Sequence, residues 1–175
     1  MKLRFPIVEM PEYSRAYEEG MPPRDRRLTE QLVHEIFPAY QARGHLTKSE
    51  FLVVCEWKTP RSQPRCATND DAFIEDISRL ALTTRSEALR IQAWTLLFGV
   101  KWPTASVFLH FLFEDRYPIL DFRALWSLGF AKPPPYTLIL WADYAVTCRA
   151  LAADARVSMR VLDQALWKYS ALHQE

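Results

Sequence analysis

The chain has 175 residues with 22 Lys and Arg against 21 Asp and Glu, which gives a formal net charge of +1 at pH 7. Its composition, 49% hydrophobic and 25% charged, is typical of a folded domain and excludes a disordered chain. The near-neutral charge excludes nucleic-acid binding through bulk electrostatics, so any such surface needs local clusters of Lys and Arg. The length suffices for one domain with a substantial core, and only four glycines disfavour a hairpin-rich β structure.

The cysteine pattern and the lengths of the hydrophobic runs indicate in which cellular compartment the protein is expected. Cys55, Cys66 and Cys148 are odd in number and widely spaced, so they predict neither a disulfide framework nor a metal or iron–sulfur site. No apolar run reaches the ~18 residues of a membrane span, and no secretory core follows the first four residues. We therefore expect a cytoplasmic protein with no membrane partner.

The N-terminal part is rich in proline, with Pro6, Pro11, Pro22 and Pro23. We predict an extended N-terminal arm over residues 1–27, with a short helix at 13–19. Apolar side chains at helical spacing then predict a helix over 28–43, which Pro38 kinks and Gly44 ends.

Capping signals delimit the following helices. Thr47, followed three residues later by Glu50, is a capping box and predicts a helix that ends near Trp57. Thr68 or Asn69 is expected to cap the next helix. Further helices are predicted over residues 73–81, 89–98, 103–113, 121–129, 136–151 and 157–172. The pattern predicts an all-α fold in a single helical domain over 1–175, with about seven to nine helices.

Residues 96–123 contain the most informative pattern. The first part is Leu96-Leu97-Phe98-Gly99-Val100-Lys101-Trp102-Pro103-Thr104-Ala105-Ser106. It predicts a helix end, a tight turn at Gly99 and a new helix, because Pro103 suits a first helical turn. Pro118 then favours an extended Tyr117. Asp121 follows where the next helix begins, a position at which free N–H groups and the helix dipole favour a carboxylate.

This pattern resembles the helix-hairpin-helix DNA glycosylase superfamily, which includes endonuclease III and the 3-methyladenine glycosylases. The family hairpin, Leu-x-Gly-Val/Ile-Gly-x-x-Thr-Ala, is similar to residues 97–105, and the spacing to the family's catalytic Asp matches Asp121. Two positions differ, since Lys101 replaces the second glycine and Pro103 stands where bifunctional members carry a Schiff-base lysine. The chain also resembles a set of small bacterial proteins with two further motifs, here Trp57-Lys58-Thr59-Pro60-Arg61 and Asp121-Phe122-Arg123-Ala124-Leu125.

The resemblance implies a helix-hairpin-helix glycosylase-like fold and a monofunctional DNA base glycosylase. Such an enzyme would cleave the N-glycosidic bond of a damaged or modified base and leave an abasic site without nicking the strand. Its role would lie in base excision repair or in defence against phage DNA with modified cytosine. Asp121 would be the catalytic carboxylate, which stabilises positive charge at C1′ or orients the attacking water once the base has left the stack.

The resemblance also assigns the remaining site residues. The hairpin residues would bind the DNA backbone: Gly99, Val100, Lys101 and Thr104. Further DNA-binding candidates are Lys58, Arg61 and Arg123, and the base-pocket candidates are Trp57, Trp102 and Tyr117. Hairpin carbonyls in this family hold a monovalent cation, and we expect no other cofactor and no bound metal.

Alternatives remain open at this point. Arg123 could pair with Glu114 or Asp115, the aromatic candidates could be core residues, and Lys58 could supply a substitute amine. We expect a monomer that binds DNA. A non-catalytic helix-hairpin-helix DNA-binding module and a helical partner-binding protein are the competing hypotheses. The identity of the base and the preference for single- or double-stranded DNA are not determined by the sequence.

Overall fold

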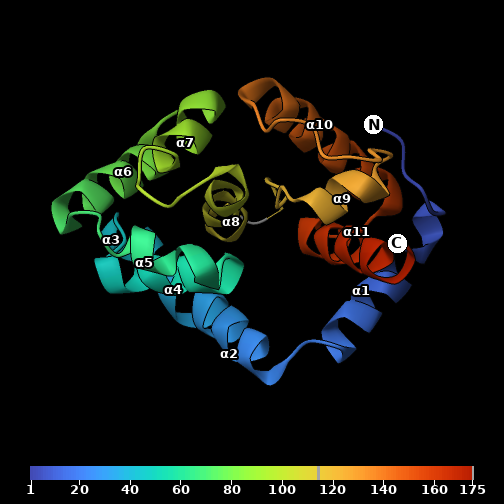
Figure 1. Cartoon of the computed structure of the whole chain (residues 1–175), viewed down its shortest axis with the longest axis horizontal. Helices are drawn as coiled ribbons and strands as arrows, with labels where there is room; N and C mark the ends of the chain where they lie inside the picture. The colour runs from blue at the N-terminus through green and yellow to red at the C-terminus, as the bar shows by residue number, and fades with distance from the viewer. Residues whose placement is uncertain (114, 175) are drawn as a thin grey trace. The chain divides into compact units, whose positions relative to one another are not determined.

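The computed structural model describes residues 1–113 and 115–174, and all regular structure in these residues is helical (Figure 1). The prediction of an all-α chain is confirmed. Residue contacts divide the chain into two compact units, unit 1 with Met1–Met21 and Phe113–Glu175 and unit 2 with Pro22–Leu112. The N-terminal residues belong to unit 1 because the N-terminal helix packs against the last helix. The single domain expected over 1–175 stays a prediction. No helix in the described part of the chain is long and apolar enough to cross a bilayer.

Unit 2 carries the predicted hairpin. Its elements are α2 (Pro23–Gln31), the π-helical η2 (Leu32–Ile36), α3 (Phe37–Arg43), α4 (Lys48–Lys58), the 3-10 helix η3 (Pro60–Ser62), α5 (Gln63–Cys66), α6 (Asp71–Thr83), α7 (Glu87–Trp94) and α8 (Trp102–Leu112). In the core, Phe108 of α8 stacks on Trp94 of α7 at 4.0 Å between ring centroids and on Phe51 of α4 at 5.6 Å. All three side chains are fully buried. The stack fixes α8, and with it the hairpin, on α4 and α7.

Unit 1 is built around its last helix. Its elements are the 3-10 helix η1 (Ile7–Glu9), α1 (Met10–Glu19), α9 (Phe122–Ser127), α10 (Leu138–Ala155) and α11 (Met159–His173). Helices α1, α9 and α10 all pack on α11 (Figure 1). Buried serines add polar ties, since Ser127 Oγ donates to Leu166 O and Ser14 Oγ donates to Gln164 Oε1, each at 2.6 Å. These bonds fix the register of α9 and α1 on α11.

The short helix predicted at 13–19 is confirmed as part of α1, but the N-terminal segment is less extended than predicted, because α1 begins at Met10 and α2 at Pro23. Helix α1 and the first turn of α2 occupy much of this segment. Pro11 and Pro23 lie in the first turns of these helices, where the missing proline N–H leaves no bond unmade. Pro11 and Pro23, which the sequence analysis took as signs of an extended arm, therefore lie at the starts of helices.

The helix predicted over 28–43 also differs in form. It begins earlier, at Pro23, and continues through a π-helical segment in which Phe37 N–H donates to Leu32 O. Pro38 cannot donate, and its ring crowds the carbonyl four residues back, so the wider π turn takes the place of the predicted kink. Gly44 ends α3 at φ +89°, as predicted.

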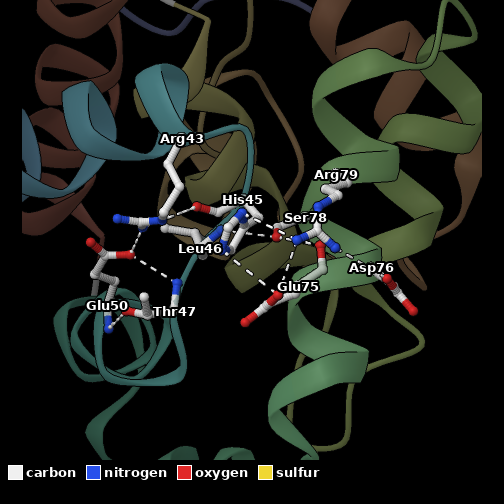
Figure 2. Close-up of polar contacts among 9 residues, drawn as sticks. All are labelled: Arg43, His45, Leu46, Thr47, Glu50, Glu75, Asp76, Ser78 and Arg79. Atoms are coloured by element: carbon white, nitrogen blue, oxygen red, sulfur yellow. Dashed lines mark hydrogen bonds and ion pairs between the residues drawn. The ribbon is translucent and has the colours of Figure 1, made fainter.

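A polar network holds the turn between α3 and α4 (Figure 2). The predicted capping box is confirmed, since Glu50 N–H donates to Thr47 Oγ1 at 3.4 Å and Thr47 N–H donates to Glu50 Oε2 at 2.8 Å. Arg43 forms an ion pair with the same Glu50 carboxylate. Leu46 N–H donates to Ser78 Oγ of α6 at 2.9 Å. The network thereby ties the α3–α4 turn to α6.

The buried bond between Leu46 and Ser78 predicts a measurable loss of stability. We expect Ser78→Ala to lower the free energy of unfolding by about 1–3 kcal/mol, because it leaves the buried Leu46 N–H without its acceptor. Urea unfolding measures this value. Ser49→Ala, at an exposed serine in the first turn of α4, is the matched control and should change stability by less than about 0.5 kcal/mol. Equal losses in the two variants would contradict the assigned role of Ser78.

Candidate functional site

The tight turn predicted at Gly99 is present in unit 2. Helix α7 ends at Trp94, earlier than the predicted residue 98, and a series of turns leads to Gly99 at φ +85°. Val100 N–H donates to Leu97 O at 3.1 Å, and Ala105 N–H donates to Lys101 O at 2.8 Å as α8 begins. Pro103 lies in the first turn of α8, as predicted. The hairpin is therefore a closed turn between two helices.

Asn69 organises this hairpin, a role that the sequence analysis missed. Its side chain is 6% exposed and binds both backbone groups of one turn residue. Asn69 Oδ1 accepts from Phe98 N–H at 2.7 Å, and Asn69 Nδ2 donates to Phe98 O at 2.9 Å and to Cys66 O at 2.8 Å. The predicted cap role of Asn69 is wrong, because Asp70 caps α6 by accepting from Phe73 N–H.

Helix α5 lies directly against Gly99. A Cβ at Gly99 would come within 2.8 Å of Cys66 Sγ, 2.9 Å of Cys66 N and 3.1 Å of Arg65 Cβ. Cys66 in turn contacts Cys55, and both thiols are fully buried. Their mutual hydrogen bond, together with burial, raises the pKa of Cys55, which stays a neutral thiol at pH 7. The pair packs beneath the hairpin.

The segment between α4 and α6 meets the hairpin at a second point. Thr59 Oγ1 lies 3.2 Å from Thr104 Oγ1, which is in the first turn of α8. The chain therefore touches the hairpin at Thr59, at Arg65 and Cys66, and at Asn69. Of the predicted residues, Lys58 ends α4 and Arg61 lies in η3, so they belong to the elements on either side of Thr59.

This segment is locally cationic. Residues 57–69 contain Lys58, Arg61 and Arg65 and no acidic residue. Arg61, Arg65 and the hairpin residue Lys101 are exposed, whereas Lys58 is half-buried. No ion pair within the described residues engages Arg61, Arg65 or Lys101. Sequence reasoning missed Arg65, although its position in an acid-free stretch beside Pro64 was a visible signal. The hairpin and the segment that contacts it therefore carry exposed positive charge at Arg61, Arg65 and Lys101.

Two predicted DNA contacts of the hairpin have internal roles instead. The Val100 side chain is buried and its N–H closes the turn onto Leu97. Thr104 is also buried, and its hydroxyl pairs with Thr59. Neither presents its side chain to a ligand in this conformation, because each holds the turn together.

The base-pocket predictions are corrected in the same way for two aromatic residues. Tyr117 is fully buried and stacks on Trp141 at 5.9 Å, and Arg149 lies 5.1 Å from its ring. Trp57 is half-buried, donates from Nε1 to Thr29 Oγ1 at 2.8 Å and packs edge-on against a ring of α8. Both are packing residues. Trp102, the first residue of α8, is half-buried.

Asp121 is located in unit 1 and caps α9. Its backbone is extended, and its Oδ1 accepts from Ala124 N–H at 2.8 Å, as the sequence predicted. The side chain is half-buried. Burial, and to a lesser degree the charge of Asp121, raises the pKa of Tyr136. Asp121 is therefore held by a defined bond, and a phenol lies within its electrostatic range.

The strand-like stretch before Asp121 is held on both sides. Ile119 N–H donates to both carboxylate oxygens of buried Asp163 at 3.1 Å, and Tyr144 Oη donates to Ile119 O at 2.9 Å. Burial is the first cause that raises the pKa of Tyr144, so the phenol stays protonated and keeps its donor. These contacts from α10 and α11 fix the backbone that leads into Asp121.

Arg123 follows in the same helix. Its guanidinium carbon lies 5.1 Å from the Trp167 ring and 5.2 Å from the Phe122 ring. Asp115, one partner offered by the sequence, accepts from Met159 N–H at 2.8 Å instead. Glu114, the other, lies outside the described residues. Arg123 is thus part of an aromatic contact on unit 1.

Comparisons with models of protein families, with curated proteins and with solved structures find no match to this chain. Residues 1–113 and 115–174 contain no group of three or more His, Cys, Asp or Glu side chains placed to hold a metal ion. The monovalent cation at the hairpin stays a prediction. The assignment of a function therefore depends on the geometry of the hairpin and of Asp121.

The contact between Gly99 and α5 predicts a difference between two glycine variants. Gly99 and Gly44 both have φ near +85 to +89°, but a Cβ at Gly44 meets nothing within 4 Å. Gly44→Ala should cost about 1–2 kcal/mol from backbone strain alone. Gly99→Ala should cost at least about 1 kcal/mol more, because its Cβ overlaps the Cys66 backbone. Urea unfolding compares the two, and equal losses would show that α5 does not press on the hairpin.

Proposed function

We propose that this protein is a monofunctional DNA base glycosylase. The observation that carries the proposal is the hairpin of unit 2, a left-handed glycine turn braced by Asn69. Lys101 is exposed in this turn, and Arg61 and Arg65 are exposed in the segment that contacts it. This arrangement supports the resemblance to helix-hairpin-helix DNA glycosylases at the level of local geometry. The hairpin residues would bind the DNA backbone, and Asp121 would be the catalytic carboxylate.

The hairpin suits a phosphate group for two physical reasons. Helix α8 begins at Trp102, and the first amides of a helix, together with its dipole, favour an anion. Lys101 in the hairpin and Arg61 in η3 add exposed positive charge to unit 2. Lys101 replaces a glycine of the family pattern. Its ammonium group would therefore contact the DNA phosphate directly, in place of part of the contact that the backbone makes in the family.

Asp121 would act on the sugar of an everted nucleotide. As the N-glycosidic bond breaks, the base departs with the bonding electrons and positive charge develops at C1′, which a carboxylate stabilises. Water then adds to C1′, its extra proton passes to the base or to solvent, and an abasic site remains. The bond from Ala124 N–H orients the Asp121 carboxylate.

The proposed reaction ends at the abasic site. Pro103 occupies the position of the Schiff-base lysine and has no amine, so no covalent enzyme–DNA bond is expected there. The base released is an alkylated purine or a modified pyrimidine, and a panel of modified DNAs separates these substrate classes.

Replacement of the carboxylate tests the chemistry. Asp121→Asn should lower base release by at least about a hundredfold, because it removes the charge that stabilises C1′. It should keep DNA affinity and stability, since Asn is an equally good helix cap. The assay incubates duplexes with alkylated purines or modified cytosines and detects abasic sites by alkaline strand cleavage.

Two further arms of this experiment separate the alternatives. Borohydride should trap no covalent complex, and a trapped complex would contradict the monofunctional assignment and implicate an amine such as that of Lys58. If no modified DNA in the panel loses a base while duplex binding is intact, the protein is a non-catalytic DNA-binding module. Activity retained in Asp121→Asn would contradict the role given to Asp121.

Removal of the hairpin charges tests the DNA interface. Arg61→Ala and Lys101→Ala should each weaken duplex binding and reduce the slope of log K against log salt by about 0.9, the value for one phosphate contact. Arg85→Ala is the matched control, because Arg85 is exposed in unit 2 beyond the far end of α7. Fluorescence anisotropy over a salt series gives both values. An equal change in all three variants would contradict a specific interface at the hairpin.

A further inference from the structure

Two buried cysteines lie next to each other beneath the hairpin. Cys55 of α4 and Cys66 of α5 are fully buried and reduced, and the Cys55 thiol donates a hydrogen bond to the Cys66 sulfur. The helices that carry them are in contact. The proposed glycosidic cleavage uses neither thiol, so the pair has no role in it.

Cys66 supports the hairpin directly. Its Sγ and its backbone N lie 2.8 and 2.9 Å from the position that a Cβ on Gly99 would occupy. Its carbonyl oxygen accepts from Asn69 Nδ2 at 2.8 Å and from Asn69 N–H at 3.2 Å. The same Asn69 side chain binds both backbone groups of Phe98. A displacement of Cys66 therefore reaches the turn at two points, Gly99 and Phe98.

The two thiols differ in acidity as an attacking and a resolving cysteine do. The hydrogen bond from Cys55 is the main cause that lowers the pKa of Cys66; burial opposes it, and the Ser62 hydroxyl adds to it. The same hydrogen bond, together with burial, raises the pKa of Cys55. Because the thiolate is the nucleophile in thiol oxidation, Cys66 is the residue that reacts first.

Local opening of a short segment gives a small oxidant access to Cys66. The 3-10 helix η3 has three residues and α5 has four, and a helix of one turn has little stability of its own. Pro60 and Pro64 in this segment supply no backbone donor. Such segments open at a lower free energy than the whole domain unfolds. Cys148, in contrast, is fully buried within the 18-residue α10 and serves as an internal reference.

We propose that hydrogen peroxide converts Cys55 and Cys66 into a reversible disulfide, and that this disulfide loosens the hairpin. The Cys66 thiolate attacks one peroxide oxygen, the O–O bond breaks, and a sulfenic acid and hydroxide form. The Cys55 sulfur then attacks the Cys66 sulfur, the S–O bond breaks, and a second hydroxide leaves. The two thiol protons convert both hydroxides to water, so the thiols lose two electrons and the peroxide gains them. A dithiol reverses the change by thiol–disulfide exchange.

The disulfide acts on the hairpin through the position of Cys66. It draws Cys66 towards α4, because a disulfide holds two sulfur atoms closer than a hydrogen bond does. The Cys66 sulfur and carbonyl then leave their places against Gly99 and Asn69, and the turn gains freedom. A less ordered turn binds its ligand more weakly. Oxidation would therefore weaken duplex binding, a consequence that rests on the proposed function.

Peptide mapping tests the disulfide without DNA. The full chain is treated with hydrogen peroxide, the remaining thiols are alkylated in denaturant, and tryptic peptides are identified by mass spectrometry. Trypsin cleaves after Lys58 and Arg65, so Cys55 and Cys66 fall in separate peptides that only a disulfide joins. We expect the joined peptides, their separation by dithiothreitol, and an alkylated Cys148. Recovery of all three cysteines as alkylated thiols, or a disulfide that includes Cys148, would overturn the proposal.

Amide hydrogen exchange by NMR tests the effect on the turn. Oxidation should speed exchange of the Phe98 and Val100 amides by about tenfold or more, because their bonds open more often. Cys148→Ala is the matched control and should form the disulfide and respond in the same way. Cys55→Ala should show no response to peroxide, and thermal unfolding confirms that both variants are folded. Unchanged exchange in a chain that carries the disulfide would contradict the switch.

Duplex binding before and after oxidation separates this proposal from the proposed function. The oxidised chain should bind an unmodified duplex more weakly than the reduced chain, and dithiothreitol should restore the affinity. If the disulfide forms and loosens the turn while the reduced chain binds no duplex, the proposed function fails and the switch stands. If the reduced chain releases a modified base and no disulfide forms, the switch fails and the proposed function stands.

Discussion

The hydrogen bonds between the Asn69 side chain and the Phe98 backbone are the constraint on which the hairpin depends. Phe98 immediately precedes the left-handed Gly99, and both of its backbone groups are taken by one buried amide. With α5 pressed against Gly99, the turn has little freedom to rearrange. A ligand that bound this turn would pay little ordering entropy, which is the physical advantage of a preorganised site.

Sequence patterns anticipated the local features of this fold and missed those that depend on distant partners. Gly44 ends α3 through its own left-handed backbone. Thr47 and Asp121 cap α4 and α9 through side chains that accept from the first helical turn. All three roles depend only on residues close in sequence. Asn69 and Asp70 have the same propensity to cap a helix. The Asn69 side chain binds Phe98, 29 residues away, and Asp70 therefore caps α6. Pro11 likewise suits a helix start as well as an arm, and the packing of α1 on α11 decides between them.

Aromatic residues show the same limit. Tyr117 and Trp57 were candidates for a base pocket, yet the first is sealed by Trp141 and the second is anchored to Thr29. The sequence analysis did not single out Trp167, because the helical periodicity of α11 identifies only the residues on the buried face of that helix. Exposure of an aromatic ring depends on which helices cover it, and the sequence pattern of one helix does not contain that information.

Several exposed charges of unit 2 are joined in ion pairs away from the hairpin. Ion pairs join Arg24 to Glu56, Arg43 to Glu50 and Lys48 to Asp71. Within residues 22–112, which the structure describes without a gap, no such pair involves Arg61, Arg65 or Lys101. Exposed ion pairs contribute little to stability, so their absence costs the fold little. Exposed charges of one sign near a turn do, however, raise the local electrostatic potential, which favours an anion there. A net charge near zero is therefore compatible with a DNA-binding surface, because the acidic residues that balance it lie on other elements.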